Sequence, residues 1–191
     1  MNYALNKKIM NYKKSLAELT NCSVEEYRMI PKLPLCVLLD NVRSMQNVGS
    51  LLRTADAFLV KEVVMAGITG VPPHKEISKT SLGAEDSVAW RHVDDAVKEC
   101  RRLKAEGKTI CVLEQAHGSI DLSEFTARGG SEYVLVVGNE VDGVDSRIVE
   151  MADVILEISM HGVKHSLNVA VSGGIALWKI TEEIGKLQRP H

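Results

Sequence analysis

Several features that would assign this chain to a common protein class are absent from its sequence. No apolar run approaches the ~20 residues that a membrane helix needs, and the stretch MNYALNKKIMNYKK lacks the apolar centre of a signal peptide. The four cysteines include no C-x-x-C pair, which argues against a zinc knuckle and a disulfide framework. We therefore expect a cytoplasmic protein in which Cys36 and Cys111, within apolar runs, are buried reduced thiols.

The common nucleotide-binding signatures are also missing. No G-x-G-x-x-G follows the first predicted strand, and no G-x-x-x-x-G-K-[ST] occurs anywhere. The formal net charge of −2 speaks against a general nucleic-acid binder. Residues 1–34 are locally basic, with six Lys or Arg against three acids. This arm is consistent either with phosphate contacts or with a solvated helix face.

The sequence does contain a regular alternation of strand and helix patterns. Its 191 residues and 45% hydrophobic content fit one compact domain, and Pro31 and Pro34 predict a boundary between an N-terminal arm, 1–34, and a domain, 35–191. The alternation predicts an α/β fold, a mainly parallel sheet covered by helices on both faces. Predicted strands are 35–40, 62–68, 88–93, 109–115, 132–138 and 153–159; predicted helices are 49–59, 94–107, 144–152 and 166–185, with a loop and short helix over 77–87.

Glycines and polar residues gather in three stretches, 41–58, 136–144 and 158–174. Each lies at or just after the carboxyl end of a predicted strand, which is where ligands bind in open α/β sheets. Taken singly, each stretch has an ordinary interpretation, with helix caps at Asn47 and Ser166, a turn at Asn139 and a solvated charge at Arg53. His161 and His165 are expected to be surface loop residues.

Taken together and in this order, the three stretches resemble the signature motifs of the SpoU, or TrmH-type, RNA 2′-O-ribose methyltransferases of the SPOUT superfamily. The first motif is matched by Asn47, Gly49 and Arg53, and the second by Gly138 and Glu140. The third is matched by Met160, Gly162, Ser166, Leu167, Asn168 and Val169. The resemblance covers roughly residues 35–185. It departs from the family pattern at Ser159, where members commonly have Pro, a difference that bears on the rigidity of that loop.

The resemblance implies a fold and a cofactor. The C-terminal part of the sheet is expected to thread a deep trefoil knot, an exception to the general absence of knots, with Gly162, Gly173 and Gly174 where backbones cross. S-adenosylmethionine is expected within the knot, its adenine between apolar side chains. By position, the implied pocket residues are Leu113, Glu114, Gln115, Gly138, Asn139, Ile158, Met160 and Leu167.

The implied reaction is methyl transfer to a ribose 2′-hydroxyl of RNA, with tRNA as the first expectation and rRNA as the second. A methyl sulfonium is already electrophilic, so no metal is expected and the protein must mainly align the hydroxyl. Because a guanidinium stays protonated, Arg53 is predicted to stabilise the alkoxide or the adjacent phosphate, with that phosphate or Glu140 accepting the proton. Asn47, Ser166 and Asn168 would orient Arg53 and the ribose, and Arg43, Lys164 and Arg53 would contact RNA.

The resemblance also implies a homodimer in which the first-motif helix and the last helix pack across a two-fold axis. Ile175, Leu177 and Trp178 are candidates either for this contact or for the core. Two alternatives remain. An S-adenosylmethionine-binding RNA module without catalysis would lack Arg53 or Asn47, and both are present. A flavodoxin-like or dinucleotide-binding enzyme would need a glycine-rich phosphate loop after the first strand, where the spacing here is wrong.

Overall fold

Seven parallel strands form a single sheet in a computed structural model that describes residues 22–188. The strand order is β3-β2-β1-β6-β4-β7-β5. The bounds are β1 Leu33–Asp40, β2 Val60–Ala66, β3 Trp90–Val93, β4 Thr109–Leu113, β5 Ile120–Asp121, β6 Tyr133–Val137 and β7 Val154–Glu157. The last two long strands of the chain flank β4, so the carboxyl ends of β4, β6 and β7 meet at one edge of the sheet. The predicted mainly parallel α/β architecture is confirmed.

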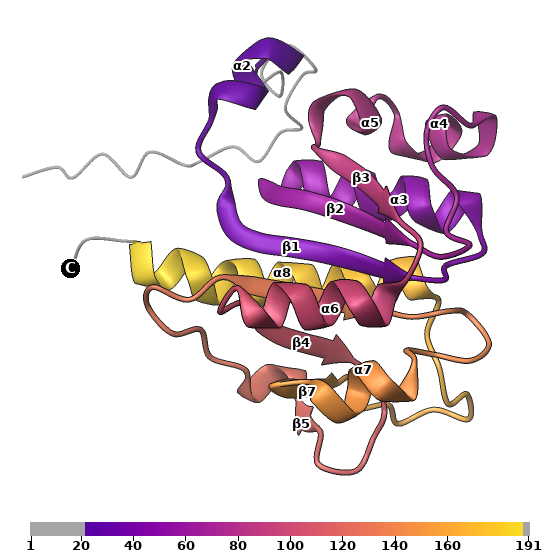
Figure 1. Cartoon of the computed structure of the whole chain (residues 1–191), viewed down its shortest axis with the longest axis vertical. Coiled ribbons are helices and arrows are strands. Elements are labelled where there is room, and N and C mark those ends of the chain that lie inside the picture. The colour runs from indigo at the N-terminus through magenta and orange to yellow at the C-terminus, as the bar shows by residue number, and fades with distance from the viewer. Residues whose placement is uncertain (1–21, 189–191) are drawn as a thin grey trace, which may run out of the picture.

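Helices cover both faces of this sheet (Figure 1). The helices α3, Met45–Ala57, and α8, Val169–Gln188, bury their apolar residues in one cluster, and α6, Ala96–Ala105, and α7, Ser146–Met151, bury theirs in a second. The remaining helices are α2 Val24–Met29, α4 Lys75–Ser81, α5 Ala84–Ser87 and the 3-10 turn η1 Leu122–Glu124.

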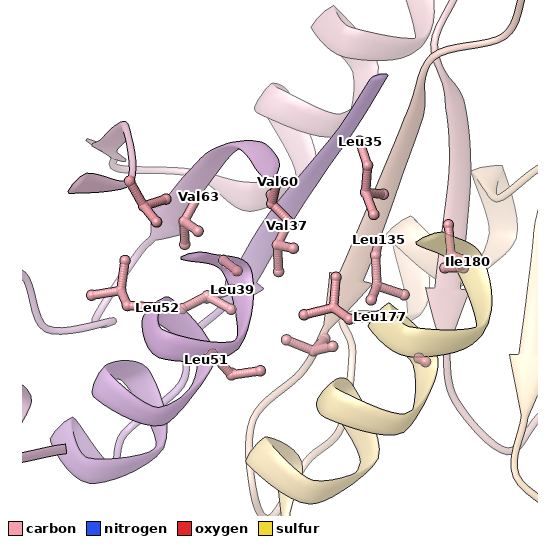
Figure 2. Packing of buried hydrophobic residues seen from close by; sticks show 14 of the residues in the cluster. Leu35, Val37, Leu39, Leu51, Leu52, Val60, Val63, Leu135, Leu177 and Ile180 are labelled. Atoms are coloured by element: carbon pink, nitrogen blue, oxygen red, sulfur yellow. The ribbon is translucent and has the colours of Figure 1, made fainter. Parts of the chain in front are cut away.

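The central strand β1 shows why its sequence is a continuous apolar run. Leu35, Val37 and Leu39 face α3 and α8, as Figure 2 shows, whereas Cys36 and Leu38 belong to the cluster on the opposite face. A parallel strand that is buried on both faces does not alternate apolar with polar residues. Burying each of these leucines stabilises the fold by roughly 1.5–3 kcal/mol relative to exposure.

The starts of two helices differ from the sequence prediction. The helix predicted to begin at residue 166 begins at Val169, because the side chain of Asn168 accepts the N–H groups of Ala170 at 2.9 Å and Val171 at 3.3 Å and so caps it. The helix predicted from residue 49 begins at Met45 behind the cap Ser44. The interpretations of Ser166 and Asn47 as caps were therefore wrong. Asn47 lies inside α3 and is free to use its side chain elsewhere.

The glycines predicted at backbone crossings do not lie at such crossings. A Cβ added to Gly162 would meet no atom within 4 Å, and one on Gly174 would only reach Thr54 at 3.9 Å. One on Gly173 would lie 2.7 Å from the side chain of Leu51, not from a backbone. A close backbone approach occurs at Gly49, whose Cβ would lie 2.3 Å from the carbonyl oxygen of Ile77 where α3 packs against α4. The trefoil knot itself stays a prediction.

The amino-terminal part of the described chain packs against α3 and α5. Tyr27 of α2 is 6% exposed, and its hydroxyl donates to the carbonyl oxygen of Asp56 at 3.1 Å. The lysines at positions 7, 8, 13 and 14 of the basic arm lie outside the described residues. Cys36 and Cys111 are buried free thiols, as predicted. Between residues 22 and 188, none of the helices has the length and apolar character needed to span a bilayer.

Candidate functional site

A pocket of about 860 Å³ lies at the carboxyl ends of β4, β6 and β7. Its walls come from residues within 113–116, 137–150, 156–160 and 165–172, segments that are distant in the sequence. This is the edge of the sheet at which the sequence predicted a ligand site. All eight predicted pocket residues line it, namely Leu113, Glu114, Gln115, Gly138, Asn139, Ile158, Met160 and Leu167.

The second motif forms a tight turn in the pocket wall. Asn139 and Gly143 exchange two backbone hydrogen bonds, of 2.9 and 3.0 Å, and the side chain of Asn139 accepts the N–H of Val141 at 2.8 Å. A Cβ on Gly138 would lie 2.2 Å from the carbonyl carbon of Gly143. Only glycine therefore lets the two arms of this turn approach so closely.

Polar side chains at the end of β4 connect the other walls. The carboxylate of Glu114 accepts the N–H groups of Val144 at 3.0 Å and Gln115 at 2.9 Å, which ties β4 to the turn of the second motif. The side chain of Gln115 donates to the carbonyl oxygen of His165 at 3.1 Å. Three walls of the pocket are thus joined through two adjacent residues.

A chain of hydrogen bonds joins the three motifs. The amide nitrogen of Asn47 donates to Oε1 of Glu140 at 2.8 Å, and its oxygen accepts from Nδ2 of Asn168 at 3.0 Å. Asn47 is 9% exposed, so these bonds form largely out of water. Glu140 and Asn168 line the pocket and Asn47 lies behind them. The structure therefore brings together Asn47, Glu140 and Asn168, as the sequence predicted for a common site.

The carboxylate of Glu140 is held by three donors. Besides Asn47, it accepts the backbone N–H groups of Arg43 and Ser44, each at 3.0 Å. Burial acts to raise the pKa of Glu140, but these donors, led by Arg43, outweigh burial and hold the pKa below its ordinary value. Glu140 is therefore ionised and fixes the residues that precede α3.

Arg53 lies apart from this network. Its side chain is exposed on α3, does not line the pocket, and has no hydrogen bond or ion pair with any residue in the described part of the chain. Arg43 and Lys164 are likewise exposed and outside the pocket lining, whereas Ser166 lines it. The predicted contact between Asn47 and Arg53 is absent among the described residues. His161 and His165 are exposed, as expected for loop residues.

Asp40 is a candidate site residue that the sequence did not predict. Asp40 ends the apolar run of β1 and is 2% exposed, and its carboxylate accepts the N–H of Asp145 and the amide of Asn41, each at 2.8 Å. Burial raises the pKa of Asp40. The side chain of Asn139 in turn donates to the carbonyl oxygen of Asn41 at 2.8 Å. The end of β1 therefore supports the turn of the second motif. In the sequence, the signal for this role was a carboxylate at the end of an otherwise apolar strand.

The lining combines apolar walls with negative charge. Leu113, Leu156, Ile158, Met160 and Leu167 supply apolar surface. The charged lining residues are Glu114, Glu140, Asp142, Glu150 and Glu157, and the described lining contains no Lys or Arg. Such a pocket suits a ligand that joins a flat apolar group to a positive charge.

Comparisons with known proteins identify relatives of this site and fold. The sequence model of the SpoU rRNA Methylase family matches residues 34–178 of this chain. The chain is 32% identical over 144 residues to a 23S rRNA (guanosine-2′-O-)-methyltransferase of Neisseria meningitidis, covering 75% of this chain and 56% of that protein. It is 33% identical over 159 residues to a tRNA (guanosine(18)-2′-O)-methyltransferase of Aquifex aeolicus, covering 82% of this chain and 74% of that protein.

A solved structure agrees with these matches. An AdoMet-bound rRNA methyltransferase from Sinorhizobium meliloti superposes with a TM-score of 0.73 at 27% identity, covering 82% of this chain and 59% of that one. The chain spans less than two thirds of the length of several curated relatives that it matches, among them the Neisseria protein at 56%.

Proposed function

We propose that this chain, which belongs to the SpoU rRNA methylase family, transfers a methyl group from S-adenosylmethionine to a ribose 2′-hydroxyl of RNA. The observation that carries the proposal is the bonding of Asn47, Glu140 and Asn168, one residue from each motif, at the wall of one pocket. The family membership supports the same reaction, since relatives of this chain are named as guanosine 2′-O-methyltransferases of tRNA and of 23S rRNA.

The chemistry of the pocket fits S-adenosylmethionine. Apolar side chains such as Leu113, Ile158 and Leu167 suit the two faces of an adenine, and the backbone of 138–143 offers groups to its edge. The carboxylates of the lining suit the sulfonium and ammonium charges. The cofactor, when bound, supplies an electrophilic methyl group, so the task of the protein is alignment and charge stabilisation.

The polar network gives each of its residues a task. Glu140, ionised and held by three donors, is a poor proton acceptor, and we assign it the role of fixing Asn47 and the start of α3. Asn168 joins this group to the loop of the third motif. To Ser166, which is exposed and lines the pocket, we assign the task of orienting the ribose. Arg53, free of other partners in the described chain, stabilises the alkoxide or the adjacent phosphate.

A homodimer would complete the surroundings of Arg53. On α8, Val171, Ile175 and Trp178 follow one another by four and three residues, and are 52%, 40% and 55% exposed. This apolar stripe adjoins α3, since the nearest side chain to a Cβ on Gly174 belongs to Thr54, next to Arg53. A second copy packed on this face would cover the stripe, whereas Leu177 belongs to the core.

RNA is the proposed substrate, with tRNA ahead of rRNA. Arg43, Arg53 and Lys164 are exposed cations near the motifs that would contact its phosphates. Affinity for RNA should therefore fall steeply with added salt, whereas affinity for S-adenosylmethionine should change little. The arm at 1–34, the cytoplasmic location and the knot stay predictions.

Two measurements on the full chain test the proposal. Calorimetric titration with S-adenosylmethionine should show one site per chain. Mass spectrometry of nucleosides from tRNA and rRNA, incubated with the protein and labelled cofactor, should show a 2′-O-methylated nucleoside. Binding without methylation of either RNA would favour the second candidate, a cofactor-binding RNA module, which the presence of both Arg53 and Asn47 disfavours.

A further inference from the structure

One wall of the pocket depends on a short edge of the sheet. Residues 158–168 connect β7 to α8, and six of them line the pocket. At this edge β7 pairs only with the two residues of β5, in the register Ile120↔Leu156 and Asp121↔Glu157. The wall therefore begins one residue beyond the last strand pairing that holds it.

That edge places two negative charges opposite each other. Asp121 and Glu157 are partners in the parallel register, and their like charges repel each other. Each carboxylate, however, accepts a hydroxyl from the opposite segment. Ser119 donates to Glu157, and Ser159 donates to Asp121. The two serines thus convert a repulsive pair into a linked one.

The alternation of side chains explains why these four residues meet. Successive side chains of a strand point to opposite faces, so 119 and 121 share a face with 157 and 159. Ile120 and its partner Leu156 point to the other face, where Leu156 is buried in the core. The side-chain hydrogen bond between Ser159 and Asp121 therefore links β5 to the chain two residues beyond the end of β7.

Asp121 is well anchored for this purpose. Its carboxylate also accepts the N–H of Ser123 at 2.8 Å and caps η1, whose Leu122 is buried. The hydroxyls of Ser123 and Ser159 hold the pKa of Asp121 well below its usual range. The carboxylate is therefore charged and fixed.

We propose that Ser159, bonded to Asp121, is a positioning residue that holds the pocket wall in its cofactor-binding conformation. Ser159 lies between Ile158 and Met160, both of which line the pocket, so its hydroxyl sets the direction in which they enter the wall. A second tether, from Gln115 to the carbonyl oxygen of His165, holds the far end of the same loop. This role rests on the proposed function, because the ligand of the pocket is taken to be S-adenosylmethionine.

Three single variants of the full chain test the proposal. Ser159→Ala removes the hydroxyl from the wall, and Ser159→Thr keeps it. Ser123→Ala is the matched control, because it removes a hydroxyl from the same carboxylate but lies in η1, outside the wall segment 158–168. The measurements are calorimetric titration with S-adenosylmethionine, cofactor KM and kcat, and hydrogen exchange of the peptide 158–168.

For Ser159→Ala we expect cofactor affinity to fall about three- to tenfold, as for loss of one hydrogen bond, with KM rising equally and kcat unchanged at saturation. Exchange of 158–168 should accelerate. Ser159→Thr and Ser123→Ala should stay within about twofold of the unchanged protein, since neither takes the hydroxyl from the wall.

Wild-type affinity and exchange in Ser159→Ala, or equal losses in Ser123→Ala, would overturn the positioning role. If the unchanged protein itself binds no S-adenosylmethionine, the proposed function fails instead. The exchange data on 158–168 then decide the role of Ser159 alone, because they need no cofactor.

Discussion

Replacing Arg53 with alanine separates chemistry from binding. The side chain is exposed on α3 and has no partner in residues 22–188, so its loss should change the free energy of unfolding by less than about 0.5 kcal/mol. Because Arg53 does not line the pocket, the dissociation constant for S-adenosylmethionine should also be preserved. Any large effect must then arise from charge that appears during the reaction.

The expected effect on the rate is large. Loss of one stabiliser of a developing oxyanion typically lowers kcat by about 10²–10³-fold, or roughly 3–4 kcal/mol. Arg53→Lys should recover little of this, because an ammonium on a flexible stem does not reproduce a planar guanidinium that contacts alkoxide and phosphate together. Single-turnover methylation of RNA, with cofactor titration of the same protein, measures the two quantities separately.

Arg101→Ala supplies the matched control. Arg101 is also an exposed arginine without a partner among the described residues, but it lies on α6 on the other face of the sheet. The Arg101→Ala protein should methylate RNA at the rate of the unchanged protein. Normal methylation by Arg53→Ala would remove this residue from the mechanism, and loss of cofactor binding would make it a structural residue instead.

Three further variants test the pocket, the dimer and the ionic network. Gly138→Ala should weaken cofactor binding at least tenfold, because its Cβ would lie 2.2 Å from the Gly143 carbonyl carbon and force the turn open at a cost of about 1–3 kcal/mol; unchanged calorimetric affinity would contradict this. Trp178→Glu, on the exposed stripe of α8, should convert a dimer to a monomer in light scattering, and a monomeric parent would refute the interface. Arg102, with Arg91, lowers the pKa of Glu99 from 4.5 to about 2. The ionised Glu99 therefore stabilises the folded protein above about pH 4.5, and this stabilisation is lost as the pH falls towards 2. Urea unfolding at pH 7 and pH 3 should show a smaller acid loss for Glu99→Gln, by roughly 1–3 kcal/mol, and equal losses would argue against it.

Local patterns were sufficient for the elements and for the composition of the site. The apolar run at 35–40 predicted a strand buried on both faces, which β1 is, and polar residues after three strands predicted the ligand edge. Local patterns failed where single side chains decide the outcome. The cap at Asn168 moved the start of α8, and β5, with two residues, is too short to have a periodicity.

The resemblance predicted which residues share the site, but not how each is used. It grouped Asn47, Glu140 and Asn168, which the structure joins by hydrogen bonds. It also placed Arg53 with them, whereas this side chain lies exposed on α3, outside the pocket lining. The direction of a side chain depends on the helix face that carries it, and that face is selected by burial of Leu51 and Leu52 against the sheet.

What the sequence alone determined is therefore the six strands other than β5, the helices α3, α6, α7 and α8, and the residue types at their ends, because these depend on short-range periodicity and on backbone capping. Only the tertiary structure decided the strand order, in which β6 lies between β1 and β4 and so brings Glu140 to Asn47 across the chain. Parallel strands have no local turn to set their neighbours, and the order follows from burying both faces of the sheet at once. The same long-range packing placed Asp121 opposite Glu157, a pairing that neither segment specifies by itself.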